Sequence, residues 1–458
     1  MKYIIGLMFF VIALFFGYVD SNVSFMKPLF STKTPYFWDR STSEVIPDNS
    51  FSTTTNNGQT CQITGLNLLL RHGARFPTLK WIQRISDLHR RLSVVTSVTS
   101  KFPFLSKWSN PFQEAKEGLL SSVGANEMKH LGRRFGKRFK VLLNGKTEEI
   151  KFAVTRQSRT KSSFEYFYEG LNATFPSSNK RPEAEEENNR LKFYEQCDKY
   201  TKEVDDNDDI LTEYDAFENG NELSNVLQKV NAKFGVFNVS IDDILVIHQI
   251  CAFELGLNQQ SEWCQFFDID DLEVIDYLND IEDYLKLGYA FPVTWQQTCP
   301  FTSYMFNRFD EAIRQTNGGH PVDISFAHGD TILPLYTALG LFRDKQPFTA
   351  ENYLANEKRT FRTSDIVPFS ANIALALYNC GASGHVVKIF VNEEAVVIPA
   401  CGKMVCNYMD IKQYYKQLVN CNFNAICENA NGIASHLRAP TFAFLICLFS
   451  LIVRNYLD

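Results

Sequence analysis

Short apolar runs alternate with amphipathic stretches along most of the chain, and this pattern predicts both strands and helices. Residues 63–70 and 322–326 are short and mostly apolar, so each predicts a buried strand. Residues 125–142 show helical spacing, and 331–342 predicts an apolar helix with Thr331 at its N-cap. Further strands are predicted at residues 151–155, 372–379, 386–392 and 395–399.

Two strand–loop–helix units lie far apart in the sequence, and a helical, partly acidic stretch separates them. We therefore expect an α/β fold, in which a sheet flanked by helices is built from both ends of the chain and a smaller α-helical domain is inserted. The expected division is a signal peptide at 1–18, an irregular N-terminal segment at 19–60, the first part of the α/β domain at 61–170, the α-rich inserted domain at 171–315, the second part of the α/β domain at 316–430 and a hydrophobic anchor signal at 431–458.

The two ends of the chain differ from its middle. Residues 1–17 hold one lysine and then an apolar run, which favours a signal peptide over a buried helix or a membrane anchor. Residues 441–453 are apolar but shorter than the ~20 residues of a membrane span. Small residues at 429–432 and a polar spacer precede them, which favours a lipid-anchor signal. A short span or a packed terminal helix is the alternative.

Charge and cysteine content narrow the class of protein. Lys+Arg total 46 and Asp+Glu 52, so the net charge of −6 disfavours a nucleic-acid partner. Of the 11 cysteines, Cys447 lies in the tail, and the other ten suit up to five disulfides in an oxidising compartment. A zinc site would need CxxC-type spacing with histidine nearby, and the sequence has no such pattern. Asn172 and Asn238 begin sequons in the folded body, as Asn22 does near the N-terminus, so we expect a secreted or cell-surface glycoprotein.

The loop after the first buried strand carries a candidate phosphate site. Arg71 and Arg75 flank His72 closely, and guanidinium groups match phosphate oxygens in pairs. His72 would then face phosphorus as a nucleophile and form a phosphohistidine. Attack needs the neutral ring, and the neighbouring guanidinium groups should lower the pKa of His72.

The loop after the second strand supplies the remaining groups. Asp330 is the candidate general acid for the leaving alkoxide, and His328 can donate to the phosphoryl oxygens. A third arginine would complete the phosphate clamp, and Arg159 is favoured over Arg156 because it begins the helix after strand 151–155. Because the arginines stabilise the charge, no metal or cofactor is required.

The string RHGARFP at residues 71–77 resembles the signature of the histidine acid phosphatases. Within them, the chain is most similar to the multiple inositol polyphosphate phosphatases, whose string continues into a lysine-bearing helix, as in Thr78-Leu79-Lys80. The distal motif of that branch is His-x-carboxylate, here His328-Gly329-Asp330 with Asp in place of the usual Glu. Other matching stretches extend over roughly residues 60–405: LSSVGANEMKHLGRRF (120–135), RTKSS (159–163), CAFELG (251–256), EWCQFF (262–267), EVIDYLNDIEDYLKLGY (273–289) and VNEEAVVIPAC (391–401).

This resemblance implies a phosphoglycerate-mutase-like fold and a metal-independent phosphomonoesterase. It places Arg71, Arg75, Arg159 and His328 at the phosphate, with His72 as nucleophile and Asp330 as proton donor. The implied substrates are inositol polyphosphates, chiefly inositol hexakisphosphate, and also 2,3-bisphosphoglycerate. Lys80 and Lys161 are candidate contacts for further phosphates, with solvated surface lysines as the alternative.

Some features depart from the family or leave other functions open. The segment AFPVTW after Tyr289 differs from the family's usual continuation, which bears on substrate preference rather than on reaction type. The ER-retention tail of vertebrate members is missing from the ending RNYLD. A general acid phosphatase without inositol preference is one alternative, and a non-catalytic surface binding protein is another. Intact Arg71, His72, Arg75, His328 and Asp330 argue against the second alternative, and a mutase ranks lower still.

Overall fold

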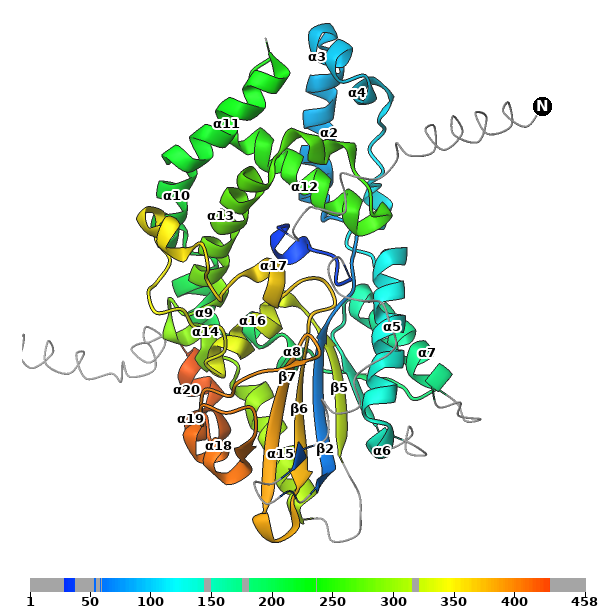
Figure 1. Cartoon of the computed structure of the whole chain (residues 1–458), viewed down its shortest axis with the longest axis vertical. Coiled ribbons are helices and arrows are strands. Elements are labelled where there is room, and N and C mark those ends of the chain that lie inside the picture. The colour runs from blue at the N-terminus through cyan, green and yellow to red at the C-terminus, as the bar shows by residue number, and fades with distance from the viewer. Residues whose placement is uncertain are drawn as a thin grey trace, which may run out of the picture.

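The computed structural model describes residues 29–37, 53–54, 58, 60–143, 150–174, 181–235, 237–314 and 321–428 (Figure 1). The expected signal peptide, the anchor signal and the Asn22 sequon lie outside these residues. No helix in the described part of the chain combines the length and apolar character that crossing a bilayer requires.

A mixed sheet forms the lower half of the molecule in Figure 1, and its strand order is β4-β3-β5-β2-β6-β7-β8. Four strands are mutually parallel: β4 (Ala184–Glu186), β3 (Lys151–Val154), β5 (Val322–Ala327) and β2 (Thr60–Arg71). The others extend the sheet in antiparallel fashion: β6 (Asn372–Asn379), β7 (His385–Val391) and β8 (Glu394–Ala395), with β1 (Thr53–Thr54) on β2 and β9 (Cys406–Asn407) on β7. The predicted α/β sheet with flanking helices is confirmed.

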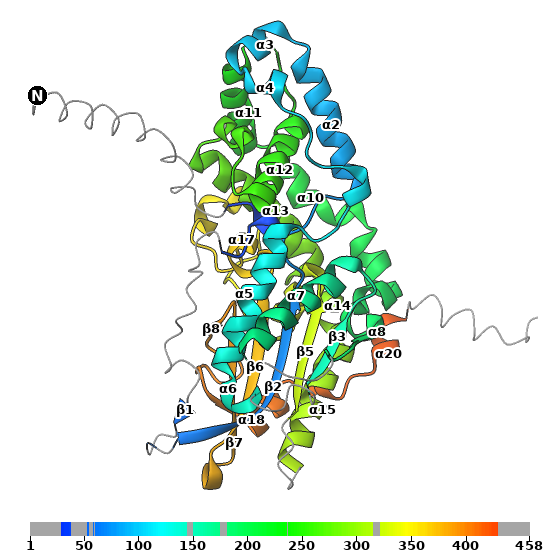
Figure 2. The ribbon, with the colours of Figure 1, turned by 90° about the vertical axis from the view of Figure 1, so that its right-hand side faces the viewer.

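The alternating side chains of β2 enter two different hydrophobic cores, because successive residues of a strand point to opposite faces. Leu68 and Leu70 belong to the core beneath α5 (Ser122–Arg138) and α7 (Ser158–Thr174), which cover one face in Figure 2. Leu69 belongs to the core on the other face, with α15 (Cys299–Arg314) and α16 (Gly329–Ala338).

A layer of helices lies over the carboxyl ends of the parallel strands (Figure 1). It contains α2 (Leu79–Ser93), α10 (Thr212–Glu218), α11 (Asn221–Phe234), α12 (Ile241–Asn258) and α13 (Ile269–Leu287). Because α2 packs against α12, the helical layer draws on the segment 61–170 as well as on 171–315. The expected domain boundaries stay a prediction.

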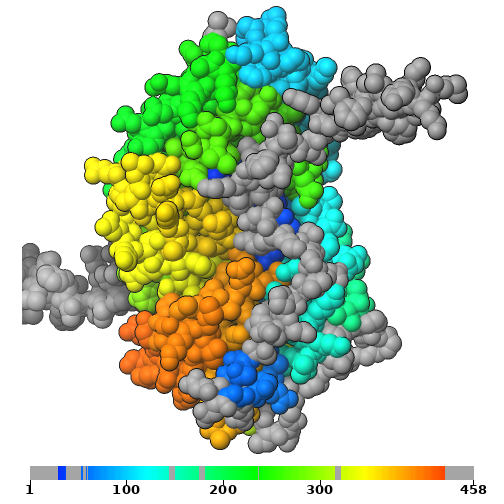
Figure 3. Space-filling view, viewed as in Figure 1, coloured from blue at the N-terminus to red at the C-terminus, as the bar shows by residue number. Residues whose placement is uncertain are grey.

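Short helices and 3₁₀ turns complete the fold. Figure 3 shows residues in the yellow colour range lying between the green helical layer and the orange carboxyl-terminal part. The short elements used below, together with the remaining α-helices, are η1 (Ser31–Lys33), α3 (Thr96–Lys101), α4 (Phe104–Lys107), α6 (Lys140–Leu143), α8 (Asn188–Leu191), α9 (Asp198–Tyr200), α14 (Pro292–Gln296), α17 (Thr363–Ile366), α18 (Tyr408–Tyr414), α19 (Lys416–Val419) and α20 (Phe423–Cys427).

Two local predictions are wrong. The N-cap of α16 is His328 rather than Thr331, because the helix begins at Gly329 and the Thr331 hydroxyl donates instead to the Leu191 carbonyl at 2.6 Å. The strand expected at 395–399 ends at Ala395. Beyond it, the Ile398 amide donates to the carbonyl of Lys403, a residue of the small loop that the Cys401–Cys406 disulfide closes.

Ten cysteines form five disulfides, which accounts for every cysteine except Cys447, a residue outside the described part of the chain. The pairs are Cys61–Cys380, Cys197–Cys427, Cys251–Cys264, Cys299–Cys421 and Cys401–Cys406. This confirms the expected number, and such cross-linking fits a protein of the secretory pathway.

The two sequons in the described body differ in exposure. Asn238 is exposed in the loop before α12, whereas Asn172 is half-buried in the last turn of α7. Glycosylation at either asparagine stays a prediction.

Candidate active site

The register of the two central parallel strands brings the two histidine motifs together. Arg71 at the end of β2 lies opposite Ala327 at the end of β5. The backbone amide of His72 donates to the Ala327 carbonyl at 3.0 Å. The rings of His72 and His328 are consequently neighbours, edge to face, with centroids 5.5 Å apart. Adjacent carboxyl ends of parallel strands are where α/β sheets form their sites.

His72 is held as a neutral imidazole with one free lone pair. Its ring is 3 % exposed, and Nδ1 lies 2.9 Å from the carbonyl oxygen of Gly73. Since a carbonyl can only accept, Nδ1 carries the hydrogen and Nε2 keeps its lone pair. Burial, followed by the charge of Arg71, holds the pKa of His72 well below its ordinary value. The geometry therefore holds an uncharged imidazole whose Nε2 keeps a lone pair, which is the form that a nucleophile requires.

The loop that carries His72 is supported from α5 and α7. The buried carboxylate of Glu127 accepts from the Ala74 amide at 3.0 Å and from Ser370, and the Gly73 amide donates to Ser163. Gly124 makes this approach possible, because a Cβ there would lie 2.2 Å from the Ala74 carbonyl oxygen. Helix and loop backbone are therefore in direct contact.

Three arginines surround the histidines and share one feature. The Nε–H groups of Arg71, Arg75 and Arg159 are buried, and within the described residues none has an acceptor. Burial, reinforced by repulsion from the other arginines, lowers the pKa of Arg71 to about 10 and that of Arg75 to about 9. Buried donors normally have partners, so this concentration of unsatisfied positive groups fits an anion.

His328 bridges Arg159 and the end of β3. Its Nδ1 lies 3.3 Å from Nη2 of Arg159, and its Nε2 lies 3.0 Å from the Thr155 hydroxyl. A guanidinium only donates, so Nδ1 accepts and Nε2 carries the hydrogen. Burial first, and then Arg159, hold the pKa of His328 well below its ordinary value.

Asp330 lies in the first turn of α16 and is exposed. Arg71, Arg75 and Arg159 each interact electrostatically with its carboxylate. The carboxyl group is thus on the open side of the arginine cluster, where a departing group could meet it.

The remaining predicted residues are exposed. Lys80 is exposed on α2, and Lys161 pairs with Glu186 at 2.9 Å. Arg156, the alternative third arginine, is exposed, whereas Arg159 contacts His328.

Sequence reasoning missed four groups beside the site. Lys192 is buried, forms an ion pair with Glu195 and acts electrostatically on His328. Tyr194 acts on Arg159, while Lys33 and Asp283 each interact with Arg71. The weak signal for Lys192 was a lone lysine within the apolar run Leu191–Phe193.

A family model described as "Histidine phosphatase superfamily (branch 2)" matches residues 62–392, which is most of the chain. The chain belongs to this superfamily. It is accordingly a phosphatase, as its relatives are. Multiple inositol polyphosphate phosphatase 1 of Gallus gallus is 30% identical over 381 residues, covering 80% of this chain and 85% of that protein. The Homo sapiens protein of the same name is 28% identical, covering 90% and 91%.

Solved structures show the same fold for this phosphatase. The phytase from D. castellii superposes with a TM-score of 0.71 at 19% identity, covering 88% of each chain. The multiple inositol polyphosphate phosphatase of Bifidobacterium longum in complex with inositol hexasulfate gives 0.69 at 15% identity, covering 85% of this chain and 97% of that one.

Proposed function

We propose that this phosphatase hydrolyses inositol polyphosphates, chiefly inositol hexakisphosphate, through a phosphohistidine on His72. The observation that carries the proposal is the neutral His72 ring among three guanidinium groups whose buried Nε–H donors have no acceptor within the described residues. Two further cations, Lys33 and Lys192, lie near the same cluster, and a substrate with several phosphates needs such additional positive charge. The relatives whose names state an inositol polyphosphate activity support this substrate class.

In the first step, the lone pair of His72 Nε2 attacks phosphorus while the bond between phosphorus and the ester oxygen breaks. Asp330 gives its proton to the departing oxygen. Arg71, Arg75 and Arg159 hold the three phosphoryl oxygens, so the developing charge meets preorganised donors. His328 can join them once a proton binds Nδ1, which the dianionic phosphoryl group favours.

In the second step, the Asp330 carboxylate accepts a proton from water, and the resulting nucleophile attacks the phosphohistidine. The P–N bond breaks, inorganic phosphate leaves, and His72 regains its lone pair. The residues supply every proton and charge in this cycle, so no step needs a metal ion.

The experiment that tests the proposal is a phosphate-release assay in EDTA that compares inositol hexakisphosphate with p-nitrophenyl phosphate. We expect a higher kcat/KM with inositol hexakisphosphate and no loss of activity on chelation. A preference for the aryl ester would instead favour the general acid phosphatase, which the similarity to the acid phosphatase of Schizosaccharomyces pombe keeps as the second candidate. We expect 2,3-bisphosphoglycerate to be a further substrate in the same assay.

Residues 1–18 and 431–458 support a proposal on location. The chain would enter the secretory pathway by the first segment and be held at the cell surface by a glycolipid attached upstream of the second. The five disulfides agree with that pathway. Release of activity from intact cells by a phosphatidylinositol-specific phospholipase would support the anchor, and complete resistance would contradict it.

A further inference from the structure

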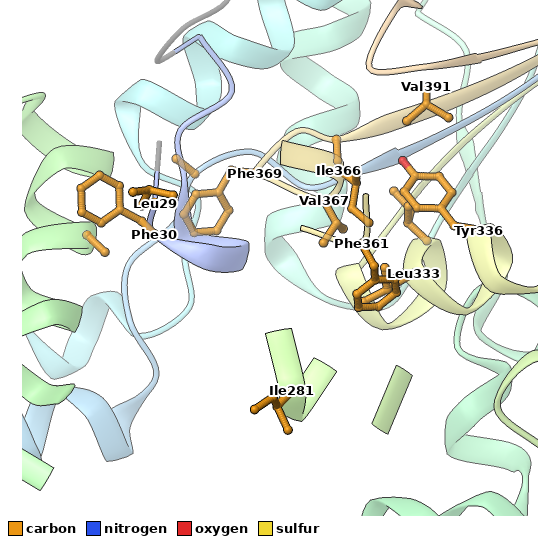
Figure 4. Packing of buried hydrophobic residues seen from close by; sticks show 14 of the residues in the cluster. Leu29, Phe30, Ile281, Leu333, Tyr336, Phe361, Ile366, Val367, Phe369 and Val391 are labelled. Carbon is orange, nitrogen blue, oxygen red and sulfur yellow. The ribbon is translucent and has the colours of Figure 1, made fainter. Parts of the chain in front are cut away.

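The segment 29–37 is built into the wall of the active site, although it precedes the sheet by many residues. Leu29 and Phe30 lie in the core shared with the helical layer, close to Phe369 in Figure 4, while Tyr36 lies in the core on the opposite face of the sheet. The Thr32 carbonyl accepts a hydrogen bond from Nη1 of Arg71. Lys33 is the next residue, so its side chain begins one residue from the carbonyl that binds Arg71.

The same segment is fastened to α13. The Ser31 amide donates to Asp276 at 3.3 Å, the Ser31 hydroxyl bonds to Thr363 of α17, and η1 packs against both helices. Figures 1 and 2 both place η1 between the helical layer and the sheet. Lys33 is therefore fixed at the junction of the two layers.

Asp283 belongs to an acidic stripe along α13. Residues at i, i+4 and i+7 lie on one face of a helix, so Asp276, Asp280 and Asp283 face the same side. Arg359 binds the first two carboxylates, and Thr363 donates to Asp280 twice. Within the described residues Asp283 has no ion pair under 4 Å, and the cation acting most strongly on it is Lys33.

Several charged groups act on this pair. Those facing Lys33 or Asp283 are Asp280 and Glu282 of α13, His248 of α12, Arg71 and Arg75 of the loop after β2, Asp330 of α16 and Tyr200 of α9. Burial raises the pKa of Asp283 to about 8, with Lys33 opposing that rise, while burial lowers the pKa of Lys33. Asp283 is therefore neutral in acid and charged in alkali, and the charge appears beside a cation that has no ion pair of its own among the described residues.

We propose that Lys33 binds a second phosphate group of the substrate and that Asp283, when ionised, weakens this contact by neutralising Lys33 and repelling the phosphate. This inference rests on the proposed function, because only a substrate with several phosphates reaches both the arginine cluster and Lys33. Affinity for polyphosphates then falls as pH rises, whereas affinity for a simple monoester does not depend on Lys33 to the same extent.

The test measures KM of the full-length enzyme for inositol hexakisphosphate and p-nitrophenyl phosphate from pH 5 to 9. The ratio of wild-type KM to Asp283→Asn KM at each pH cancels the titration of the substrate itself. For inositol hexakisphosphate we expect this ratio to be near one at pH 5 and to rise roughly five- to tenfold by pH 9, as removal of one nearby negative charge should give. For the aryl ester it should stay within about twofold at both ends.

Lys33→Met should raise KM for inositol hexakisphosphate at pH 5 about tenfold more than KM for the aryl ester, and Lys33→Arg should restore most of that loss. In the Lys33→Met background, Asp283→Asn should no longer lower KM. Asp270→Asn is the matched control, because it removes an exposed carboxylate from the first turn of the same helix. It should leave both pH profiles as in the wild type.

The outcomes separate this inference from the proposed function. No turnover of inositol hexakisphosphate by the wild type would overturn the proposed substrate. If the wild type turns over inositol hexakisphosphate but the pH profile of Asp283→Asn runs parallel to that of the wild type, only this inference is overturned. Equal changes in KM for both substrates in Lys33→Met would likewise overturn only this inference.

Discussion

Nη2 of Arg159 lies 3.3 Å from Nδ1 of His328, and this one contact fixes the hydrogen positions on the histidine. Because arginine only donates, His328 is an acceptor on that side and a donor to Thr155 on the other. The imidazole therefore links Arg159, a proposed phosphate ligand, to Thr155 at the end of β3. The same neutral state holds at His72 through the Gly73 carbonyl. Two uncharged rings among three guanidinium groups leave a concentration of positive charge that suits an anion such as phosphate.

Replacement of the proposed nucleophile is the first test of this arrangement. We expect His72→Ala to lower kcat by more than about a thousandfold with every substrate, because the proposed phosphohistidine forms on this ring. His385→Ala is the matched control, since that histidine begins β7 at the distal end of the β6–β7 hairpin. Steady-state phosphate release measures both variants. Activity of His72→Ala near that of the control would refute the assignment.

The role of Asp330 predicts a dependence on the leaving group. An alkoxide needs a proton as it departs, whereas p-nitrophenolate leaves without one, so Asp330→Asn should slow inositol phosphates about a hundredfold more than aryl phosphates. The measurement is kcat over a series of esters with leaving groups of graded basicity. Equal losses across the series would mean that Asp330 acts only through its charge on the arginines.

The contact between α5 and the catalytic loop predicts an effect on activity from a residue that touches no substrate. A methyl group at Gly124 would clash with the Ala74 carbonyl, so Gly124→Ala should displace the loop and lower both Tm and kcat/KM. Gly132→Ala is the matched control on the same helix, where the added Cβ would lie 2.0 Å from the Phe167 carbonyl instead. It should lower Tm and leave most of the kcat/KM of the surviving folded enzyme. If the two variants lost similar amounts of kcat/KM for the same decrease in Tm, the contact between α5 and the loop would have no specific effect on activity.

Much of the sheet could be predicted because its strands are buried. The boundaries 372–379 match β6, and the two histidine loops begin where apolar runs end. Residues 395–399 are equally apolar, yet the strand ends at Ala395. The Val396 amide still donates to the Ile389 carbonyl of β7, but the Ile398 amide turns to the Lys403 carbonyl instead. The N-cap of α16 was misplaced because the Thr331 hydroxyl finds a tertiary partner.

Some residues near the site could be predicted from the sequence, and others are placed there only by tertiary contacts. Arg71 ends β2, and His72 and Arg75 follow it in the next loop, so their spacing alone predicted that they lie together. Lys33 could not be predicted, because it lies in a stretch rich in Ser, Thr and Pro that is placed only by tertiary bonds such as Ser31 to Asp276. Asp283 is one of several acidic residues on α13, and only packing distinguishes the carboxylate that faces the site.

His248 predicts how stability depends on pH. The ring is buried on α12, and Nε2–H donates to the Leu29 carbonyl at 3.3 Å. Burial lowers its pKa to about 4, against about 6.5 in the unfolded chain. Between these values the unfolded chain binds the extra proton, so the contribution of His248 is present above pH 6.5 and is lost as pH falls toward 4.

At pH 4.5 the pKa difference has removed about 2 to 3 kcal/mol of unfolding free energy, at about 1.4 kcal/mol for each pH unit. His248→Gln keeps a donor for the Leu29 carbonyl and does not titrate. Urea unfolding at pH 8 gives the structural cost of the substitution, since the wild-type ring is neutral there in both states. From pH 8 to 4.5 the variant should then lose about 2 to 3 kcal/mol less than the wild type. Parallel losses in the two proteins would show that His248 titrates alike in the folded and unfolded chain, and that its contact with Leu29 does not shift the proton equilibrium.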